Sequence, residues 1–438
     1  MILSLSRDLK ADAAEVFLRA STSTSIEIKD QKVDAFERAR DLGVGLRVLL
    51  DGRTGFSYTT DLAETSLREL VRSAVNGARN TEPDLFAIIP ERPSSPYQSV
   101  NIFDPAIVAL SEQEKISRVM AMEREAYAMD QRIRRIRKAS AGFYEAETLI
   151  ANSYGASISY QSTAVSASVE VVAEEKGESQ AGWESDVKRY YGKLDIEDVG
   201  RKAARKALDL LGACHIDSVK APVVLEASVA EEFLSIIASG FSAENVQKKR
   251  SLFIGKLGTE VASPLITVYD DGLLDGGMGT APADDELVPA RKKTVIDQGT
   301  LALFLHNART ANQDRTESTG NGIRGGFKGV PGVGVTNLYI APGSHSPEEL
   351  ITSTARGLYV TEIMGAHMAN PISGDFSVGA TGFWIENGKK AYPVREITIA
   401  GNVLDLMRNV DAVGNDLHFS GRIGSPTIRV KELTIGGR

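Results

Sequence analysis

The sequence predicts an α+β protein, with helices packed on an antiparallel-rich sheet in the first half and mostly β-structure in the second. Alternating apolar and polar residues, which are typical of half-buried strands, occur at residues 14–19, 25–30 and 43–50. Apolar residues at helical spacing predict amphipathic helices at residues 61–79, 111–130 and 195–211. Beyond Gly240 the chain is dense in Gly and Asp, which indicates strands joined by loops.

Four turn signals divide the predicted strands. They lie at residues 51–52, 152–155, 174–177 and 386–389. Asp-Gly and Asn-Gly pairs favour the tight turns that join neighbouring antiparallel strands. We therefore expect antiparallel hairpins in both halves of the chain.

Three predicted helices begin with a capping-box pattern, in which a polar residue and an acid three positions later satisfy free backbone N–H groups. The pairs are Asp61 with Glu64, Ser111 with Glu114, and Ser228 with Glu231. The third pair predicts a helix directly after the short apolar strand 222–225.

A domain boundary is expected near residues 215–221, after Gly212 ends the third helix. This gives an N-terminal α+β domain over residues 1–215 and a C-terminal β-rich domain over residues 216–438. A chain of 438 residues supports two or three domains at ~100–200 residues each.

The charge balance and the cysteine count exclude several classes. Lys and Arg total 50 against 58 Asp and Glu, a net charge of −8, which argues against direct nucleic-acid binding. The basic run 132–138 is interpreted as a strand with a solvated face, with a nucleic-acid contact as the sharper alternative. The single cysteine, Cys214, excludes an internal disulfide and any zinc site that needs two cysteines.

No apolar run approaches the ~18 residues of a membrane helix, so no membrane contact and a cytoplasmic location are expected. The familiar HExxH, GxSxG and GxxxxGK[ST] motifs do not occur. No two of the five histidines lie within six residues of each other. Surface or core roles are expected for four of them, His215, His306, His345 and His418.

One loop, residues 364–380, concentrates polar side chains before an alternating strand. It contains His367, Asn370, Ser373 and Asp375. Loops on rigid strands often carry binding residues. The alternative is that the polar side chains only tie the turn through backbone hydrogen bonds.

The same loop carries a family resemblance. MGAHMANPISGDFSVGATGFWIENG, residues 364–388, resembles the C-terminal signature of the TldD/PmbA family, long labelled modulators of DNA gyrase. GVGVTNLYIAPG, residues 332–343, is similar to the family's preceding strand, and residues 44–48 also fit. The resemblance covers nearly the whole chain.

The resemblance implies one of two branches. TldD-like chains carry an HExxxH helix that binds zinc, together with a Cys nearer the C-terminus. Here Ser235, Ile236 and Gly240 stand at about the positions of the first His, the Glu and the second His, and no Cys follows Asp416. Hydroxyl and alkyl side chains do not replace imidazole and thiolate as zinc ligands. The chain therefore resembles the PmbA/TldE branch, with no metal or cofactor of its own and no catalytic residue.

For this branch the resemblance implies a heteromer with a TldD-like paralogous subunit that holds the zinc. The complex trims or degrades unfolded and leader-type peptides, and this chain supplies walls and contacts. The candidates for contact with substrate or partner are His367, Asn370, Ser373, Asp375 and Phe376. A homodimer of the chain alone is also left open.

Two other functions stay open on sequence grounds. One is an independently active peptidase with scattered ligands such as His367 and Asp375, although zinc needs about three protein ligands. The other is a regulatory protein that acts on a nucleic-acid enzyme, as the family label suggests.

Overall fold

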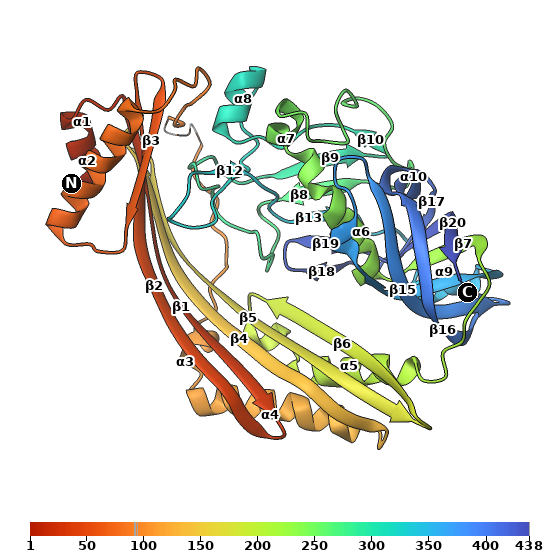
Figure 1. Ribbon diagram of the computed structural model, residues 1–438. Helices are drawn as coiled ribbons and strands as arrows, with labels where there is room; N and C mark the ends of the chain where they lie inside the picture. The colour runs from red at the N-terminus through yellow and green to blue at the C-terminus, as the bar shows by residue number, and fades with distance from the viewer. Residues whose placement is uncertain (92, 94, 438) are drawn as a thin grey trace.

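The computed structural model describes residues 1–91, 93 and 95–437, and it is an α+β structure with two unequal halves. In Figure 1 a curved sheet of very long strands in the N-terminal half bends around the C-terminal half. The chain ends lie in different halves, with the N-terminus beside α1 and α2 and the C-terminus beside β7 and β20.

The N-terminal half is built on hairpins with strands of up to 20 residues. Its elements are α1 (Ile2–Asp8), β1 (Ala13–Lys29), β2 (Lys32–Leu50), β3 (Arg53–Thr59), α2 (Glu64–Arg79), α3 (Pro105–Ala109), α4 (Glu112–Ala128), β4 (Ile133–Asn152), β5 (Ser157–Glu175), β6 (Glu178–Lys188), the 3-10 turn η1 (Tyr191–Lys193) and α5 (Ile196–Asp209). The strands form one antiparallel sheet in the order β3-β2-β1-β4-β5-β6. The antiparallel hairpins predicted from the turn signals are therefore confirmed.

The two faces of this sheet differ because side chains alternate along each strand. On β5 the apolar residues Val165, Val169 and Val171 are buried with residues of α4 and α5. Val44 and Leu46 of β2 are buried with α2 in the same way. The intervening positions point to the opposite, concave face, which looks toward the C-terminal half (Figure 1).

The C-terminal half is mostly β-structure with short helices. Its elements are β7 (Val219–Leu225), α6 (Ala227–Ala238), η2 (Ser239–Phe241), α7 (Ala243–Gln247), β8 (Val268–Asp271), β9 (Lys292–Asp297), β10 (Thr300–Leu301), α8 (Ala308–Asp314), β11 (Gly322–Ile323), β12 (Gly332–Val333), β13 (Leu338–Ile340), α9 (Pro347–Thr352), β14 (Arg356–Met364), η3 (Ala366–Met368), β15 (Asp375–Glu386), β16 (Lys389–Asn402), α10 (Val403–Arg408), β17 (Val410–Val413), β18 (His418–Ser420), β19 (Ile423–Ser425) and β20 (Ile428–Gly436).

One sheet of the C-terminal half closes on itself. Its order is β16-β15-β14-β7-β20-β17, and β16 also pairs with β20, which makes a β-barrel. A second sheet, β10-β9-β8-β13-β19-β18, lies beside it. Apolar residues of both sheets and of α6 share one large buried cluster, so they fold as one core.

Local predictions are confirmed in most places and wrong in two. Ser111 and Glu114 form the predicted capping box of α4. The helices α2 and α6 instead begin after Ala63 and Glu226, without a side-chain cap. Asp61 still supports the start of α2, because it accepts hydrogen bonds from the Ala63 N–H and the Ser66 hydroxyl. At α6 the strand β7 is followed so closely by the helix that Ser228 already lies inside it.

The basic run at the start of β4 is a solvated strand face, as predicted. Arg135 pairs with Glu174 and Arg137 with Glu170, both across to β5, and Lys138 pairs with Glu27 on β1. These cations are exposed and already matched by acids, which leaves the run without excess positive charge.

The two halves meet at a buried charge cluster, which we call the joint. Arg47 of β2 lies 3.1 Å from Glu15 of β1 and 3.0 Å from Glu286 of the C-terminal half. Arg324, from the Gly-rich loop 320–334, pairs with the other oxygen of Glu15. Glu15 and Glu286 are fully buried, so each depends on these arginines for charge compensation.

Candidate functional site

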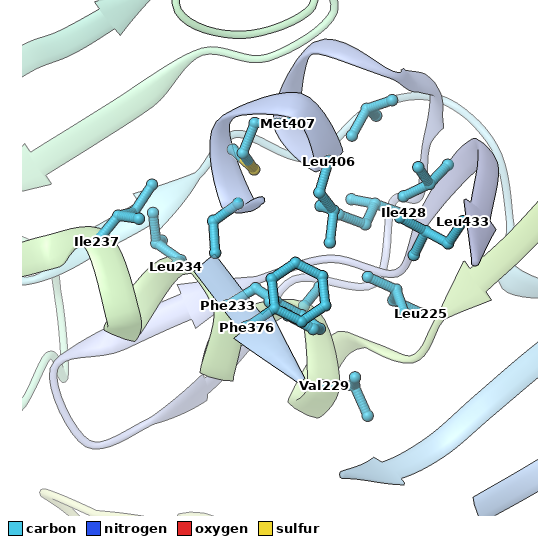
Figure 2. Close-up of a cluster of buried hydrophobic side chains, with 14 of the residues drawn as sticks. Leu225, Val229, Phe233, Leu234, Ile237, Phe376, Leu406, Met407, Ile428 and Leu433 are labelled. Carbon is cyan, nitrogen blue, oxygen red and sulfur yellow. The ribbon is translucent and has the colours of Figure 1, made fainter. Parts of the chain in front are cut away.

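The helix α6 lies where the resemblance places a metal-binding helix, and its inner side is firmly packed. Phe233, Leu234 and Ile237 are at most 1% exposed and face the C-terminal core. Figure 2 shows these three side chains directed into the cluster. Because apolar residues recur at three- and four-residue spacing on that side, the helix is held in one orientation.

The outer side of α6 carries two exposed serines, Ser235 and Ser239, one turn apart, with Ile236 partly buried between them. Gly240, just beyond the helix, is buried, and a Cβ there would lie 2.7 Å from the Leu252 side chain. No imidazole or carboxylate occupies the positions of Ser235, Ile236 and Gly240. Hydroxyl, alkyl and hydrogen side chains do not fit a zinc ligand set, so this side of α6 supports no metal-dependent step.

Acidic groups do gather toward the start of α6. Glu231 Oε2 lies 3.6 Å from Nδ1 of His418 on β18. Burial, followed by repulsion from Glu231 and Glu362, raises the pKa of Glu232 to about 7. Burial likewise raises the pKa of Glu362 on β14. Within the described residues no three His, Cys, Asp or Glu side chains are arranged to hold a metal ion.

The signature loop, residues 364–375, packs beside α6 through η3. Asn370 accepts hydrogen bonds from the N–H groups of Ile372 and Ser373 at 2.9 and 3.2 Å. Ser373 donates to Asp375 at 2.8 Å, and Asn402 of β16 donates to Asp375 at 3.0 Å. These bonds lower the pKa of Asp375, whose carboxylate they stabilise. The three polar side chains therefore tie the loop to β16.

The other two predicted contact residues differ in burial. Phe376 is 5% exposed and meets the Phe233 ring edge-on at 4.9 Å (Figure 2), so it supports α6 from inside the core. His367 is exposed. Around it the loop presents three large apolar side chains to solvent, Met364, Met368 and Ile372, with 49–69% of each exposed. An exposed apolar group of this kind is a typical contact surface.

Sequence reasoning missed part of this surface. It singled out the polar residues of the loop, yet the exposed apolar methionines and the acids around α6 are equally prominent. A signal for the methionines was available, because Met364 and Met368 flank His367 in a segment rich in turn residues. The proximity of Glu232 and Glu362 is set by strand order and could not be read from their separation of 130 residues.

Comparison with known proteins defines the class to which this fold belongs. Residues 14–78, 106–211 and 218–437 match family models described as PmbA/TldA metallopeptidase domain 1, central domain and C-terminal domain. The chain is 30% identical over 432 residues to metalloprotease PmbA of Escherichia coli O157:H7. The aligned region covers 98% of this chain and 93% of that relative. The chain belongs to the PmbA/TldD metallopeptidase family.

Relatives named TldD and TldE both match the chain over nearly its full length. A metalloprotease TldD homolog of Haemophilus influenzae is 27% identical over 459 residues, covering 97% of this chain and 93% of the relative. A crystal structure from Thermotoga maritima, described as a modulator of a DNA gyrase, superposes with a TM-score of 0.93 at 30% identity and covers 99% and 98% of the two chains. TldE from Thermococcus kodakarensis, at 23% identity, shares the fold with a TM-score of 0.90 over 100% and 99% of the chains. In the described part of this chain, no helix is both long and apolar enough to cross a membrane.

Proposed function

We propose that this chain is the metal-free subunit of a cytoplasmic TldD/TldE-type metallopeptidase complex that trims or degrades unfolded and leader-type peptides. A TldD-like subunit supplies the zinc, and its motif glutamate activates water. This chain supplies part of the wall and contacts for the peptide. The observation that carries the proposal is the end of α6 and the residue just beyond it, where Ser235, Ile236 and Gly240 stand at the positions of the zinc motif.

The signature loop supports the assembly part of the proposal. Its polar residues fix the loop against β16, which leaves His367, Met364, Met368 and Ile372 on a rigid, outward-facing support. A loop whose backbone is already held in place loses little backbone entropy on binding, so the apolar side chains it carries suit a subunit contact. We assign this surface to contact with the partner or the peptide.

The test compares this chain alone, a TldD-like chain alone and their mixture. We expect this chain to bind less than about 0.1 zinc per molecule, measured by plasma mass spectrometry after dialysis. Cleavage of an unfolded peptide, followed by mass spectrometry, is expected only in the mixture. Substitution of the glutamate in the partner's HExxxH motif should abolish that cleavage, because Ile236 stands at the corresponding position of this chain.

Variants of the loop test the surface separately. His367→Ala and Met368→Ala should leave thermal stability unchanged, because both side chains are exposed, and should weaken association with the TldD-like chain. Ser377→Ala, an exposed change on β15, is the matched control. Stoichiometric zinc and chelator-sensitive cleavage by this chain alone would show an independent peptidase. Unchanged association in both loop variants would remove the surface from the proposal.

A further inference from the structure

A cavity of about 390 Å³ lies between the concave face of the N-terminal sheet and the loops of the C-terminal half. Residues of β1, β4 and β5, together with Arg189 just beyond β6, line one side of it. The segments 272–285 and 320–324 and the β18–β19 turn line the other. We call it the arginine cavity, after Arg19, Arg189, Arg324 and Arg422.

The four guanidinium groups differ in their ion pairs and hydrogen bonds. Arg324 is neutralised by Glu15 at the joint, and Arg189 donates to the carbonyl oxygens of Thr163, Gly277 and Met278. Arg19 donates to the hydroxyl of Tyr144 at 2.9 and 3.2 Å. The hydrogen-bond partners of Arg19 and Arg189 are therefore all uncharged. Arg422 is exposed and forms no hydrogen bond or ion pair with its side chain in the described part of the chain.

The remaining charges confirm an excess of positive charge. Two acids line the cavity, Asp284 and Asp285. Asp284 accepts the N–H of Gly322, and burial raises its pKa. Asp285 faces Arg19, Arg324 and Arg422, and its oxygen already accepts the backbone N–H of Arg324 at 2.7 Å. Burial and then the neighbouring Arg422 lower the pKa of Arg189 to about 10, because both disfavour the charged guanidinium. An anionic group bound here would relieve this repulsion.

A second, independent observation points to a ligand. Thr336 lines the cavity, and its hydroxyl oxygen is buried and has no hydrogen-bond partner among the described residues. The Thr336 residue as a whole is 6% exposed. Buried hydroxyls without partners are uncommon, because each loses its bonds to water on burial. A bound oxygen-bearing group would satisfy it.

The cavity continues into a groove floored by small polar side chains. The groove holds about 350 Å³ and is lined by Ser25, Ser140, Ser166, Ser168 and Ser185 of the concave face, with Trp183 among its lining residues. Val187 lines both spaces, and the β18–β19 turn borders both, with Ser420 at the groove and Arg422 at the cavity. The two spaces therefore adjoin beneath one hairpin turn.

The shape of this space favours a chain end over the middle of a chain. Arg324 belongs to the cavity wall and pairs with the fully buried Glu15 of the joint. A peptide that enters the cavity from the groove meets the joint at Arg324, so we place the end of the chain among the arginines. The group that ends a peptide there and pairs with arginine in a two-pronged geometry is the carboxylate.

We propose that the arginine cavity binds the C-terminal carboxylate of a peptide whose preceding residues lie along the serine-lined groove. That this peptide is a substrate rests on the function proposed above, whereas the binding is a property of this chain alone. In this arrangement Arg422 and Arg19 bind the carboxylate, and Thr336 donates its hydroxyl to it. Most residues that line the groove are small, so the peptide is accepted with little regard to sequence.

The test uses two decapeptides of Gly, Ala and Ser with fluorescein at the N-terminus, one with a free C-terminal carboxylate and one with a C-terminal amide. Fluorescence anisotropy is measured with the purified chain alone, so failure of zinc catalysis in any mixture does not affect the result. We expect the free acid to bind at least about tenfold more tightly than the amide. Arg422→Gln should remove that difference, whereas Arg72→Gln, an exposed change on α2, should keep it.

Other outcomes decide against the proposal. Equal binding of acid and amide would overturn it. Displacement of the free acid by millimolar inorganic phosphate, but not by equimolar acetate, would assign the cavity to a phosphate and also overturn it. Ser166→Leu, which narrows the groove, should weaken both peptides and keep their ratio; an unchanged affinity for both would remove the groove from the proposal. Circular dichroism on each variant confirms that the chain is folded.

Discussion

The N-terminal sheet and the C-terminal barrel bury their strands in opposite ways. The barrel closes through the β16–β20 pairing and packs α6 into one large apolar cluster. The N-terminal sheet remains open, and its helix-covered face is apolar, whereas its other face is apolar where Phe17 and Ile150 pack against Leu287 and Phe327 of the C-terminal half. A closed core leaves its interior no room for a ligand, whereas a half-covered sheet keeps a polar concave face free for binding. The two tryptophans divide in the same way, since Trp384 belongs to the barrel and Trp183 to the sheet.

The largest expected effect tests whether the two cores are separate. Phe233→Ala removes an aromatic ring that is 0% exposed and should lower the free energy of unfolding of the C-terminal half by about 3–5 kcal/mol. Urea unfolding is followed by Trp384 fluorescence in a Trp183→Phe background, and by Trp183 fluorescence in a Trp384→Phe background. The Trp384 transition should shift much more. Ser235→Ala, on the outer side of the same helix, is the control and should change neither midpoint.

The next largest effect is expected from a substitution at the joint, which connects the two halves. Glu15→Gln leaves Arg324 without its carboxylate and Arg47 with Glu286 alone, in a fully buried site. Removing one partner of a buried pair costs about 3 kcal/mol, so both tryptophan transitions should fall together. Glu64→Gln, which removes an exposed pair with Arg68, should change stability by less than about 0.5 kcal/mol. A shift confined to Trp183 would show that the joint stabilises the sheet only.

Element types and hairpins were predictable because they depend on neighbours in the chain. The turn at Asp51-Gly52 and the turn at Asn387-Gly388 adopt the positive φ angles that those residues favour. Strand length was harder to predict. The stretches 14–19 and 25–29 belong to one 17-residue strand, because the serines and threonines between them, which alternate between the two faces, interrupt the apolar pattern without ending the strand. Closure of the barrel depends on the pairing of strands far apart in sequence, which no local pattern records.

The candidate site was predictable only in part, for the same reason. The loop containing His367 and Asp375 stood out by composition, and the helix after β7 followed from its apolar spacing. The arginine cavity draws Arg19, Arg189 and Arg422 from three distant segments. Each of these arginines looks ordinary in its own segment, so only the curvature of the sheet brings them together.

A smaller effect concerns pH and the half-buried acid on α6. The folded state raises the pKa of Glu232 from 4.5 to about 7, chiefly through burial and then through Glu231 and Glu362. Folded protein thus keeps a proton that unfolded protein releases, and this group's contribution to stability falls as pH rises from 4.5 to about 7. Glu232→Gln should therefore raise stability by about 1 kcal/mol at pH 8, after allowance for solvent screening, and by little at pH 4.5. Thermal unfolding at both values checks this, with Glu69→Gln on α2 as an exposed control; a gain that is equal at both values would assign the effect to something other than titration.

The smallest expected effect concerns the contact between α2 and β3 in the N-terminal half, where one glycine has free space beside it and the other does not. Gly77 of α2 and Gly55 of β3 face each other. A Cβ at Gly77 would have its nearest neighbour at 3.9 Å, whereas a Cβ at Gly55 would lie 2.0 Å from the carbonyl oxygen of Ala74. Gly77→Ala should stabilise the Trp183 transition by about 0.5–1 kcal/mol, because alanine loses less backbone entropy in a helix. Gly55→Ala should destabilise the same transition, because the helix must move away from the strand. If both variants changed the stability in the same direction in urea titrations, helix propensity, and not the closeness of α2 to β3, would set stability at this end of the sheet.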